Sequence, residues 1–164
     1  MNDDTNLIDI SMLQQLQDQF CCADHLYLMC VDKNKGVVTK PFGTEEQVGF
    51  LRTQVDKHAY MELVDQMQHD RTVVERETAQ DFMKLCAVST KVEDQLQVVW
   101  IVMGIIKERL TPEVHLPEGM LITTEEQFYA SVEFLSMLSG QLFESRRNQM
   151  IAQKAVEKSS VSEL

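Results

Sequence analysis

The amino-acid sequence predicts an α+β domain in which helices flank a central antiparallel sheet of five to six strands, with long helices near both ends. The main observation is the stretch 95–106, which begins as alternating apolar residues and ends as a continuous apolar run around Trp100. β-Branched and aromatic side chains suit a pleated surface, and a strand that is apolar on both faces needs a layer packed on each side. We therefore expect 95–106 to be the central strand of a sheet covered on both faces. A buried helix is the competing interpretation, since apolar runs are ambiguous by period, and the alternating start favours the strand.

A helix and a β-hairpin are expected at the N-terminal side. The helix is predicted over 11–22, where Ser11–Gln14 fits a capping box and apolar residues recur at helical spacing. Alternation predicts a strand over 25–31. The segment 32–36, rich in Asp, Asn and Gly, predicts the turn, and 37–40 the return strand.

The middle of the chain predicts more helix, followed by a three-strand meander that includes the central strand. A second capping box at 44–47 opens helical sequence over 45–69, which we expect to form one long or two shorter helices. The segment 71–78 alternates weakly and predicts a third strand. A fourth strand is expected over 82–92, with 93–94 as the turn into the central strand.

The last part of the chain predicts a loop and then a long helix. Prolines and glycine mark 108–120 as the loop, and Thr123 is the expected cap of the helix. We divide the chain into a core, 1–122, a C-terminal helix, 123–158, and a disordered tail, 159–164. Five apolar residues of the helix are spaced by three and four, as in a coiled-coil seam: Phe128, Val132, Leu135, Leu138 and Leu142. This stripe either packs on the chain's own sheet or forms a dimer, and the two roles are compatible if different faces serve each.

Charge and cysteine content exclude several classes of function. The formal net charge is −11 and the pI about 4.7, which opposes binding to nucleic acid or to anionic lipid. No stretch is long and apolar enough to predict a membrane span, and the acidic residues 1–6 do not resemble a secretory signal. We therefore expect a cytoplasmic protein whose four cysteines, Cys21, Cys22, Cys30 and Cys86, are reduced thiols.

No motif points to catalysis, a metal or a particular cofactor. The four histidines lack a partner at the i+4 spacing of a helical metal pair, and no phosphate-binding loop, nucleophile elbow or dinucleotide motif is present. We expect no enzyme activity. Five residues are candidates for lining a ligand pocket: Trp100, Cys86, Tyr60, His58 and Met103. For each of them, a role in core packing or on the surface is the simpler interpretation. The pair Arg146-Arg147 is interpreted as a solvated helix face.

Two stretches resemble a known group of sensor domains. They are Leu7–Phe20, followed by Leu28-Met-Cys-Val-Asp32, and the strand–turn–strand Leu85–Gly104. Together with the order helix, hairpin, helix, three strands and helix, these stretches resemble the PAS/GAF type of sensory domain, and most closely its PocR-like subgroup. In that family the last strand pairs with the first and lies mid-sheet, as expected for 95–106.

The resemblance implies a role in signal transduction. Such domains sit at the N-terminus of bacterial sensor histidine kinases, cyclic-nucleotide enzymes or transcription regulators, and their final helix transmits the signal to an output domain. It implies a homodimer, a small-molecule ligand or the loss of one, and an output domain in the same chain or a partner kinase. The alternative is a non-sensory interaction or dimerisation domain of profilin-like or roadblock-like fold, which has a similar order of elements and needs no pocket.

Overall fold

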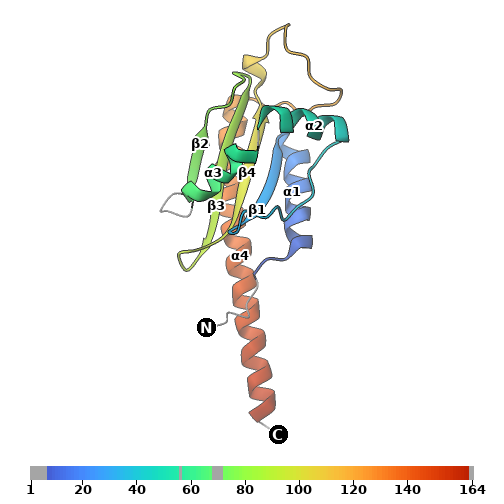
Figure 1. Ribbon diagram of the computed structural model, residues 1–164. Coiled ribbons are helices and arrows are strands. Elements are labelled where there is room, and N and C mark those ends of the chain that lie inside the picture. The colour runs from blue at the N-terminus through green and yellow to red at the C-terminus, as the bar shows by residue number, and fades with distance from the viewer. Residues whose placement is uncertain (1–6, 56, 68–71, 163–164) are drawn as a thin grey trace.

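The computed structural model describes residues 7–55, 57–67 and 72–162, which form an α+β fold around one antiparallel sheet (Figure 1). The described strands are β1 (Tyr27–Asp32), β2 (Val73–Arg76), β3 (Met83–Val92) and β4 (Gln95–Ile105). The helices are α1 (Ile10–Asp24), α2 (Glu45–Gln54), α3 (Lys57–Met67), α4 (Glu125–Ser162) and the 3-10 helix η1 (Lys107–Arg109). The strand order is β1-β4-β3-β2, and every neighbouring pair is antiparallel.

The prediction of a central strand is confirmed. β4 pairs with β1 along one edge and with β3 along the other, and Trp100 lies opposite both Cys30 and Val88. All residues from Val98 to Ile105 on this strand are buried. The turn between β3 and β4 has positive φ at Glu93 (52°) and Asp94 (62°), the pattern of a tight hairpin turn formed here without glycine.

The predicted number of strands, five to six, is wrong, because the described sheet has four. The expected return strand 37–40 makes only an isolated bridge, between Val31 and Val37. Beyond it, side chains take the place of the ladder. The Thr39 hydroxyl accepts from the Cys30 N–H (3.1 Å), and the backbone of Lys40 is held by the Gln14 and Gln17 amides of α1. A segment whose backbone groups are satisfied in this way gains nothing from extending the sheet.

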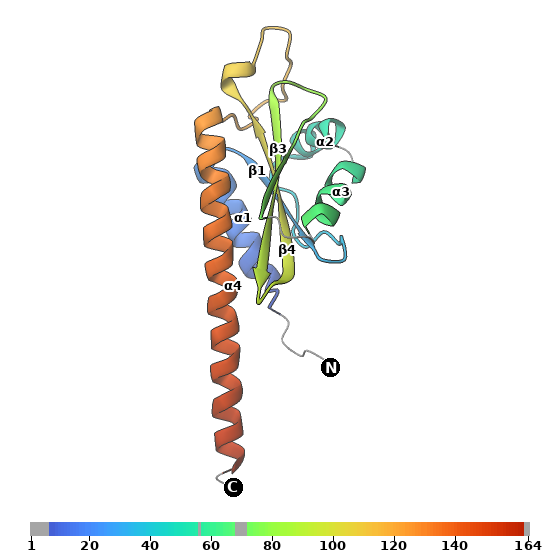
Figure 2. The ribbon, with the colours of Figure 1, turned by 90° about the vertical axis from the view of Figure 1, so that its left-hand side faces the viewer.

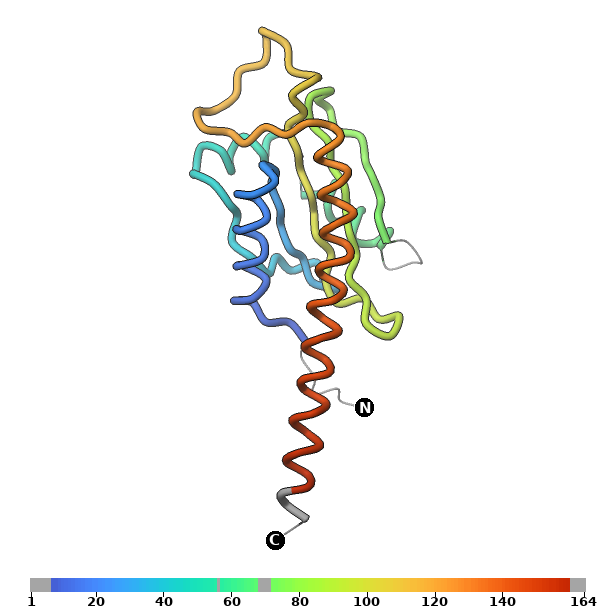
Figure 3. The backbone as a smooth tube through the Cα atoms, turned by 180° about the vertical axis from the view of Figure 1, so that it is seen from behind, coloured from blue at the N-terminus to red at the C-terminus, as the bar shows by residue number. Residues whose placement is uncertain are grey.

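The sheet is covered on both faces, which gives three layers. Figure 2 shows α1 and α4 against one face and α2 and α3 against the other. Seen from behind, α1 and α4 run side by side across the sheet (Figure 3), and the Phe20 and Phe134 rings stack between them at 6.1 Å. Because side chains alternate along a strand, each face of β4 contributes to a separate core.

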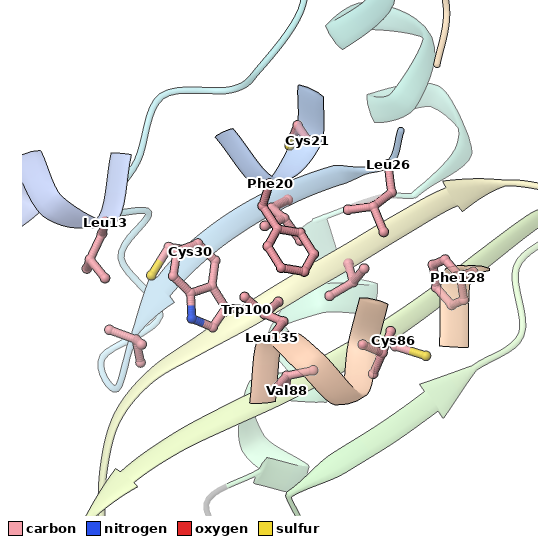
Figure 4. Close-up of a cluster of buried hydrophobic side chains, with 14 of the residues drawn as sticks. Leu13, Phe20, Cys21, Leu26, Cys30, Cys86, Val88, Trp100, Phe128 and Leu135 are labelled. Carbon is pink, nitrogen blue, oxygen red and sulfur yellow. The ribbon is translucent and has the colours of Figure 1, made fainter. Parts of the chain in front are cut away.

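The first core lies under α1 and α4 and is centred on Trp100 (Figure 4). Its buried members include Leu13, Phe20, Leu26, Cys30, Cys86, Val88, Trp100, Phe128, Leu135 and Phe143. The Trp100 indole N–H donates to the Ser139 hydroxyl of α4 (2.9 Å), which also lies 2.6 Å from the Thr90 hydroxyl of β3. This buried polar contact fixes the position of α4 over the centre of the sheet.

The second core lies under α2 and α3. Its buried members include Tyr27, Val31, Leu51, Leu63, Val64, Met67, Leu85, Ala87, Val99, Ile101 and Ile105. The predicted helical stretch 45–69 forms two helices, α2 and α3, and residues 68 and 69 lie outside the described part of the chain. The capping box that opens α2 is confirmed, since Thr44 and Gln47 exchange both side chain–backbone hydrogen bonds.

The caps of the two terminal helices differ from the prediction. α1 begins earlier, because the Asp9 carboxylate accepts from the Met12 N–H (3.2 Å) and takes the role assigned to Ser11. α4 is capped by Thr124 instead of Thr123, whose backbone is used in a bridge to Ile106. Both shifts follow from neighbouring residues with equal capping ability.

α4 continues well beyond the sheet and ends later than predicted. It is helical to Ser162 instead of ending near residue 158, so the predicted disordered tail is helical as far as it is described. The pair Arg146-Arg147 lies where the helix leaves the core: Arg146 is 3.8 Å from the Asp9 carboxylate and Arg147 pairs with Glu93. Residues 151–159 are exposed, and Figure 1 shows this end projecting past the other elements.

Candidate functional site

A cavity of about 500 Å³ lies between the sheet and the helices α2 and α3. These two helices cover the face of the sheet opposite α4 (Figure 2). The floor of the cavity comes from β1 and β4, one wall from α2 and the start of α3, and another wall from the segment that follows the β1 turn. The lining residues are Tyr27, Leu28, Met29, Val37, Pro41, Phe42, Val48, Leu51, Arg52, Val55, Lys57, Tyr60, Ile101 and Met103. Mostly apolar walls with a few polar groups are typical of small-molecule sites, and the volume lies in their usual range.

The strand register positions the floor of this cavity. Met29 lies opposite Ile101, and Tyr27 lies opposite Met103, on adjacent antiparallel strands. These four side chains therefore share one face of the sheet, which is the face that α2 and α3 cover only in part. Two flexible methionines in the floor let the shape of the cavity adapt to an occupant.

The wall formed by α2 is held at the N-terminal end of the helix. Its N-terminus carries the capping box, and the Gln47 side chain also donates to the Glu118 carbonyl (2.9 Å) in the loop after β4. Gly43, directly before the cap, has φ +112° and lies so close to Gln47 that a Cβ there would be 2.7 Å from its Oε1. A glycine is therefore required for the chain to enter α2 at this angle.

The hydroxyl of Tyr27 is already engaged at the edge of the cavity. It accepts from the Leu121 N–H (2.8 Å) and lies 3.6 Å from the Met120 sulfur, and burial raises the pKa of Tyr27. This tyrosine therefore stays protonated and serves to tie β1 to the loop before α4.

Two cations stand at the rim of the cavity. Arg52 is in the last turn of α2 and Lys57 begins α3; both are exposed. Neither has a carboxylate within ion-pair distance among the described residues, whereas the other described arginines, Arg76, Arg109, Arg146 and Arg147, each have one. Within residues 7–55, 57–67 and 72–162, the charged side chains of the lining are thus both positive.

The predicted pocket residues divide between the two faces of the sheet. Tyr60 and Met103 do line the cavity. Trp100 and Cys86 are buried in the core beneath α4, and His58 is exposed on α3 outside the lining. Trp100 and Met103 differ by an odd number of positions on one strand, so the alternation of side chains already places them on opposite faces.

The predicted seam of the final helix is mostly occupied by the chain's own sheet. Phe128, Val132 and Leu135 are buried in the first core, while Leu138 and Leu142 are half-buried. The exposed surface of α4 instead includes Phe134, whose ring also stacks on Phe20 of α1, and Met137; they are 49% and 54% exposed.

A charged cluster fixes the start of α4 to the sheet edge. Lys84 of β3 is only 9% exposed, and its Nζ lies 3.2 Å from carboxylate oxygens of Glu75 and Glu125 and 2.7 Å from the Tyr129 hydroxyl. Burial alone would lower the pKa of Lys84, but the hydrogen bonds to Tyr129, Glu125 and Glu75 outweigh it and raise the pKa. The ammonium is therefore charged and fully used within this cluster.

The described residues offer no metal site and no reactive thiol in the cavity. No group of three or more His, Cys, Asp or Glu side chains within the described ranges is arranged to hold a metal ion. All four cysteines are free, and burial raises the pKa of Cys21 and Cys86 to about 12. In the part of the chain that the structure covers, no helix combines the length and apolar character needed to span a bilayer.

Sequence reasoning missed Arg52, Lys57 and Phe42. Isolated basic residues on a helical stretch carry no signal of a site, and Phe42 lies in an irregular segment without periodicity. The feature that unites them is the packing angle of α2 and α3, which no local pattern encodes. Comparisons with known proteins supply no further guide: the chain matches no family model, and no curated protein matches it significantly.

Proposed function

We propose that this chain is a cytoplasmic sensory input domain of the PAS/GAF-like type, closest to the PocR-like sensors. It binds a small ligand and passes the signal through α4 to an output domain, such as a bacterial histidine kinase, in the same chain or in a partner. The observation that carries the proposal is the apolar cavity of about 500 Å³ on the sheet face opposite α4.

The alternation of β4 supplies a physical route from ligand to helix. Ile101 and Met103 line the cavity. Trp100, which directly precedes Ile101 on β4, points to the other face of the sheet and donates a hydrogen bond to Ser139 of α4. A change in the packing of the floor alters the position of one strand, which both faces share. A tightly packed interface of this kind transmits a displacement because it favours discrete arrangements.

The far end of α4 suits transmission to a further domain. It is clamped to the core by Arg146 and Arg147, and beyond them it projects with Ile151 and Val156 exposed. We include a homodimer in the proposal, formed through the outward face of α4. Light scattering is expected to give the mass of a dimer, and Met137→Glu together with Ile151→Glu is expected to give a monomer.

Ligand binding is tested with the neutral dye N-phenyl-1-naphthylamine, whose fluorescence rises in apolar sites. We expect saturable binding of one dye per chain, and loss of binding in Met29→Trp, where the indole fills the cavity. Val48→Trp, from the α2 wall, is the second filling variant if the first does not fold, as judged by circular dichroism. Native mass spectrometry of the purified protein tests for a retained ligand.

Two results would contradict the sensory proposal. One is the absence of saturable dye binding; the other is binding that both filling variants leave unchanged. A dimer that binds no dye would favour the alternative, a non-sensory interaction domain of profilin-like or roadblock-like type, for which exposed Phe134 and Met137 would provide the contact surface.

A further inference from the structure

The charges around the cavity restrict what it can bind. Among the residues that the structure describes, its lining contains two side chains of full charge, Arg52 and Lys57, and no acidic one. This is notable in a chain of net charge −11, in which Asp and Glu outnumber Lys and Arg by 26 to 15. A positive rim of this kind attracts anions to the opening and repels cations from it.

The two cations are also available to a ligand. Within the described residues neither is engaged in an ion pair, and both lie on the exposed rim, where partial hydration lowers the cost of keeping them unpaired. A guanidinium and an ammonium on the lining of one cavity are both donors to anions, which suits a carboxylate-type head group.

The interior of the cavity calls for a different chemistry. Leu51, Val55, Ile101 and Met103 present hydrocarbon and thioether surface, and Phe42 packs 6.4 Å from the Tyr27 ring at the wall. The Tyr27 hydroxyl is already bonded to Leu121, so it offers little to a polar ligand body. An apolar body buried here and an acidic head at the rim satisfy both regions together.

The geometry points to an amphipathic organic anion as the ligand: an aliphatic or aromatic body within the cavity and one carboxylate or similar acid group at the rim that carries Arg52 and Lys57. This inference rests on the proposed ligand-binding function and specifies the chemical class of the ligand. It excludes polar sugars and organic cations as occupants of this site.

A matched pair of dyes tests the inference. The probes are 8-anilinonaphthalene-1-sulfonate and N-phenyl-1-naphthylamine, which share one aromatic body and differ by the sulfonate. Dissociation constants are measured by fluorescence titration. We expect the anionic dye to bind wild type about tenfold more tightly than the neutral dye, as one well-placed charged hydrogen bond provides. The preference is expected to shrink at about 0.5 M salt, because exposed charges are screened.

Variants separate local from overall charge. Arg52→Gln with Lys57→Gln is expected to abolish the preference and leave the neutral dye's affinity unchanged. The control, Lys154→Gln with Lys158→Gln, makes the same change in net charge on the exposed end of α4 and is expected to have no effect. Val48→Trp is expected to remove binding of both dyes, which places them in the cavity.

The outcomes distinguish the two proposals. Equal affinity for the two dyes in wild type, or a preference that survives in the rim variant, would overturn the anion inference and leave the ligand-binding proposal standing. The proposed function itself would be overturned if neither dye bound the wild type, or if Val48→Trp left the binding of both dyes unchanged.

Discussion

Individual side chains of the first core connect the sheet to the final helix. Ser139 is fully buried in α4 and serves both the Trp100 indole and the Thr90 hydroxyl. A serine in the interior of a helix does not by itself stabilise the helix. Ser139 stabilises the fold because it satisfies two buried polar groups that come from two different strands.

Replacing Ser139 is expected to destabilise the fold. In Ser139→Ala, the Trp100 N–H and the Thr90 hydroxyl lose their partner, and we expect a loss of about 1–2 kcal/mol in the free energy of unfolding. Urea unfolding measures it, and emission from Trp100, the sole tryptophan, is expected to shift as its hydrogen bond is lost. The control is Ser145→Ala at an exposed site of the same helix; an equal loss in that variant would contradict the role assigned to Ser139.

The four cysteines are expected to differ sharply in reactivity. Cys22 is exposed on α1, whereas Cys21, Cys30 and Cys86 are buried, and burial raises the pKa of each buried thiol. In the folded protein, 5,5′-dithiobis(2-nitrobenzoate) is expected to label one thiol rapidly, and Cys22→Ser is expected to remove that phase. Rapid labelling of a second thiol would contradict the described packing.

The same thiols make stability depend on alkaline pH. The pKa of each buried thiol is raised in the folded state, so these groups stay protonated there while they ionise in the unfolded chain. The contribution of these thiols to the free energy of unfolding is complete below the pKa of an unfolded cysteine, about 8.5. It is lost as the pH rises above that value. The free energy of unfolding is therefore expected to fall between pH 8 and pH 10, and less steeply in Cys86→Ala.

At the scale of elements, the close approach of β4 and α4 depends on a residue without a side chain. A Cβ at Gly104 would lie 2.5 Å from Cδ2 of Phe128 and 2.9 Å from its Cε2. Phe128 is fully buried, which leaves its ring no free direction in which to move.

Gly104→Ala is therefore expected to destabilise the protein by about 1–3 kcal/mol, as overpacking does. The double variant with Phe128→Leu is expected to lose less than the sum of the two single changes, because the smaller side chain relieves the contact. Gly140→Ala is the matched control: a Cβ there meets nothing within 4 Å, and we expect a gain of about 0.5–1 kcal/mol from helix propensity. Strict additivity in the double variant would contradict the proposed contact.

The elements that the sequence predicted well are those whose pattern is periodic and long. The central strand, its neighbour 82–92 and the final helix all lie where periodicity placed them. The return strand 37–40 did not form, because Thr39 and the glutamines of α1 satisfy its backbone, and this competition depends on tertiary contacts. The helix caps moved by one or two residues for a similar reason, since several neighbouring residues can serve as a cap.

At the scale of the whole molecule, the sheet separates two structural regions. One face carries the cavity. The other face carries α1 and α4, and β4 is shared between the two (Figure 2). Sequence reasoning found Tyr60 and Met103 because they are aromatic or polarisable residues near expected core. It placed Trp100 in the same group, because composition alone does not tell which face α2 and α3 leave partly open.

The claim that the cavity and the final helix are coupled is tested most directly by hydrogen–deuterium exchange of α4. Exchange is measured with and without whichever of the two dyes binds more tightly. We expect amide exchange in residues 125–147 to slow by at least about twofold when the cavity is filled, because local opening of the helix depends on its packing against β4. Met29→Trp, in which the indole is expected to fill the cavity, is expected to show no change on dye addition. Slower exchange confined to β1, α2 and α3, with α4 unaffected in the wild type, would contradict the account.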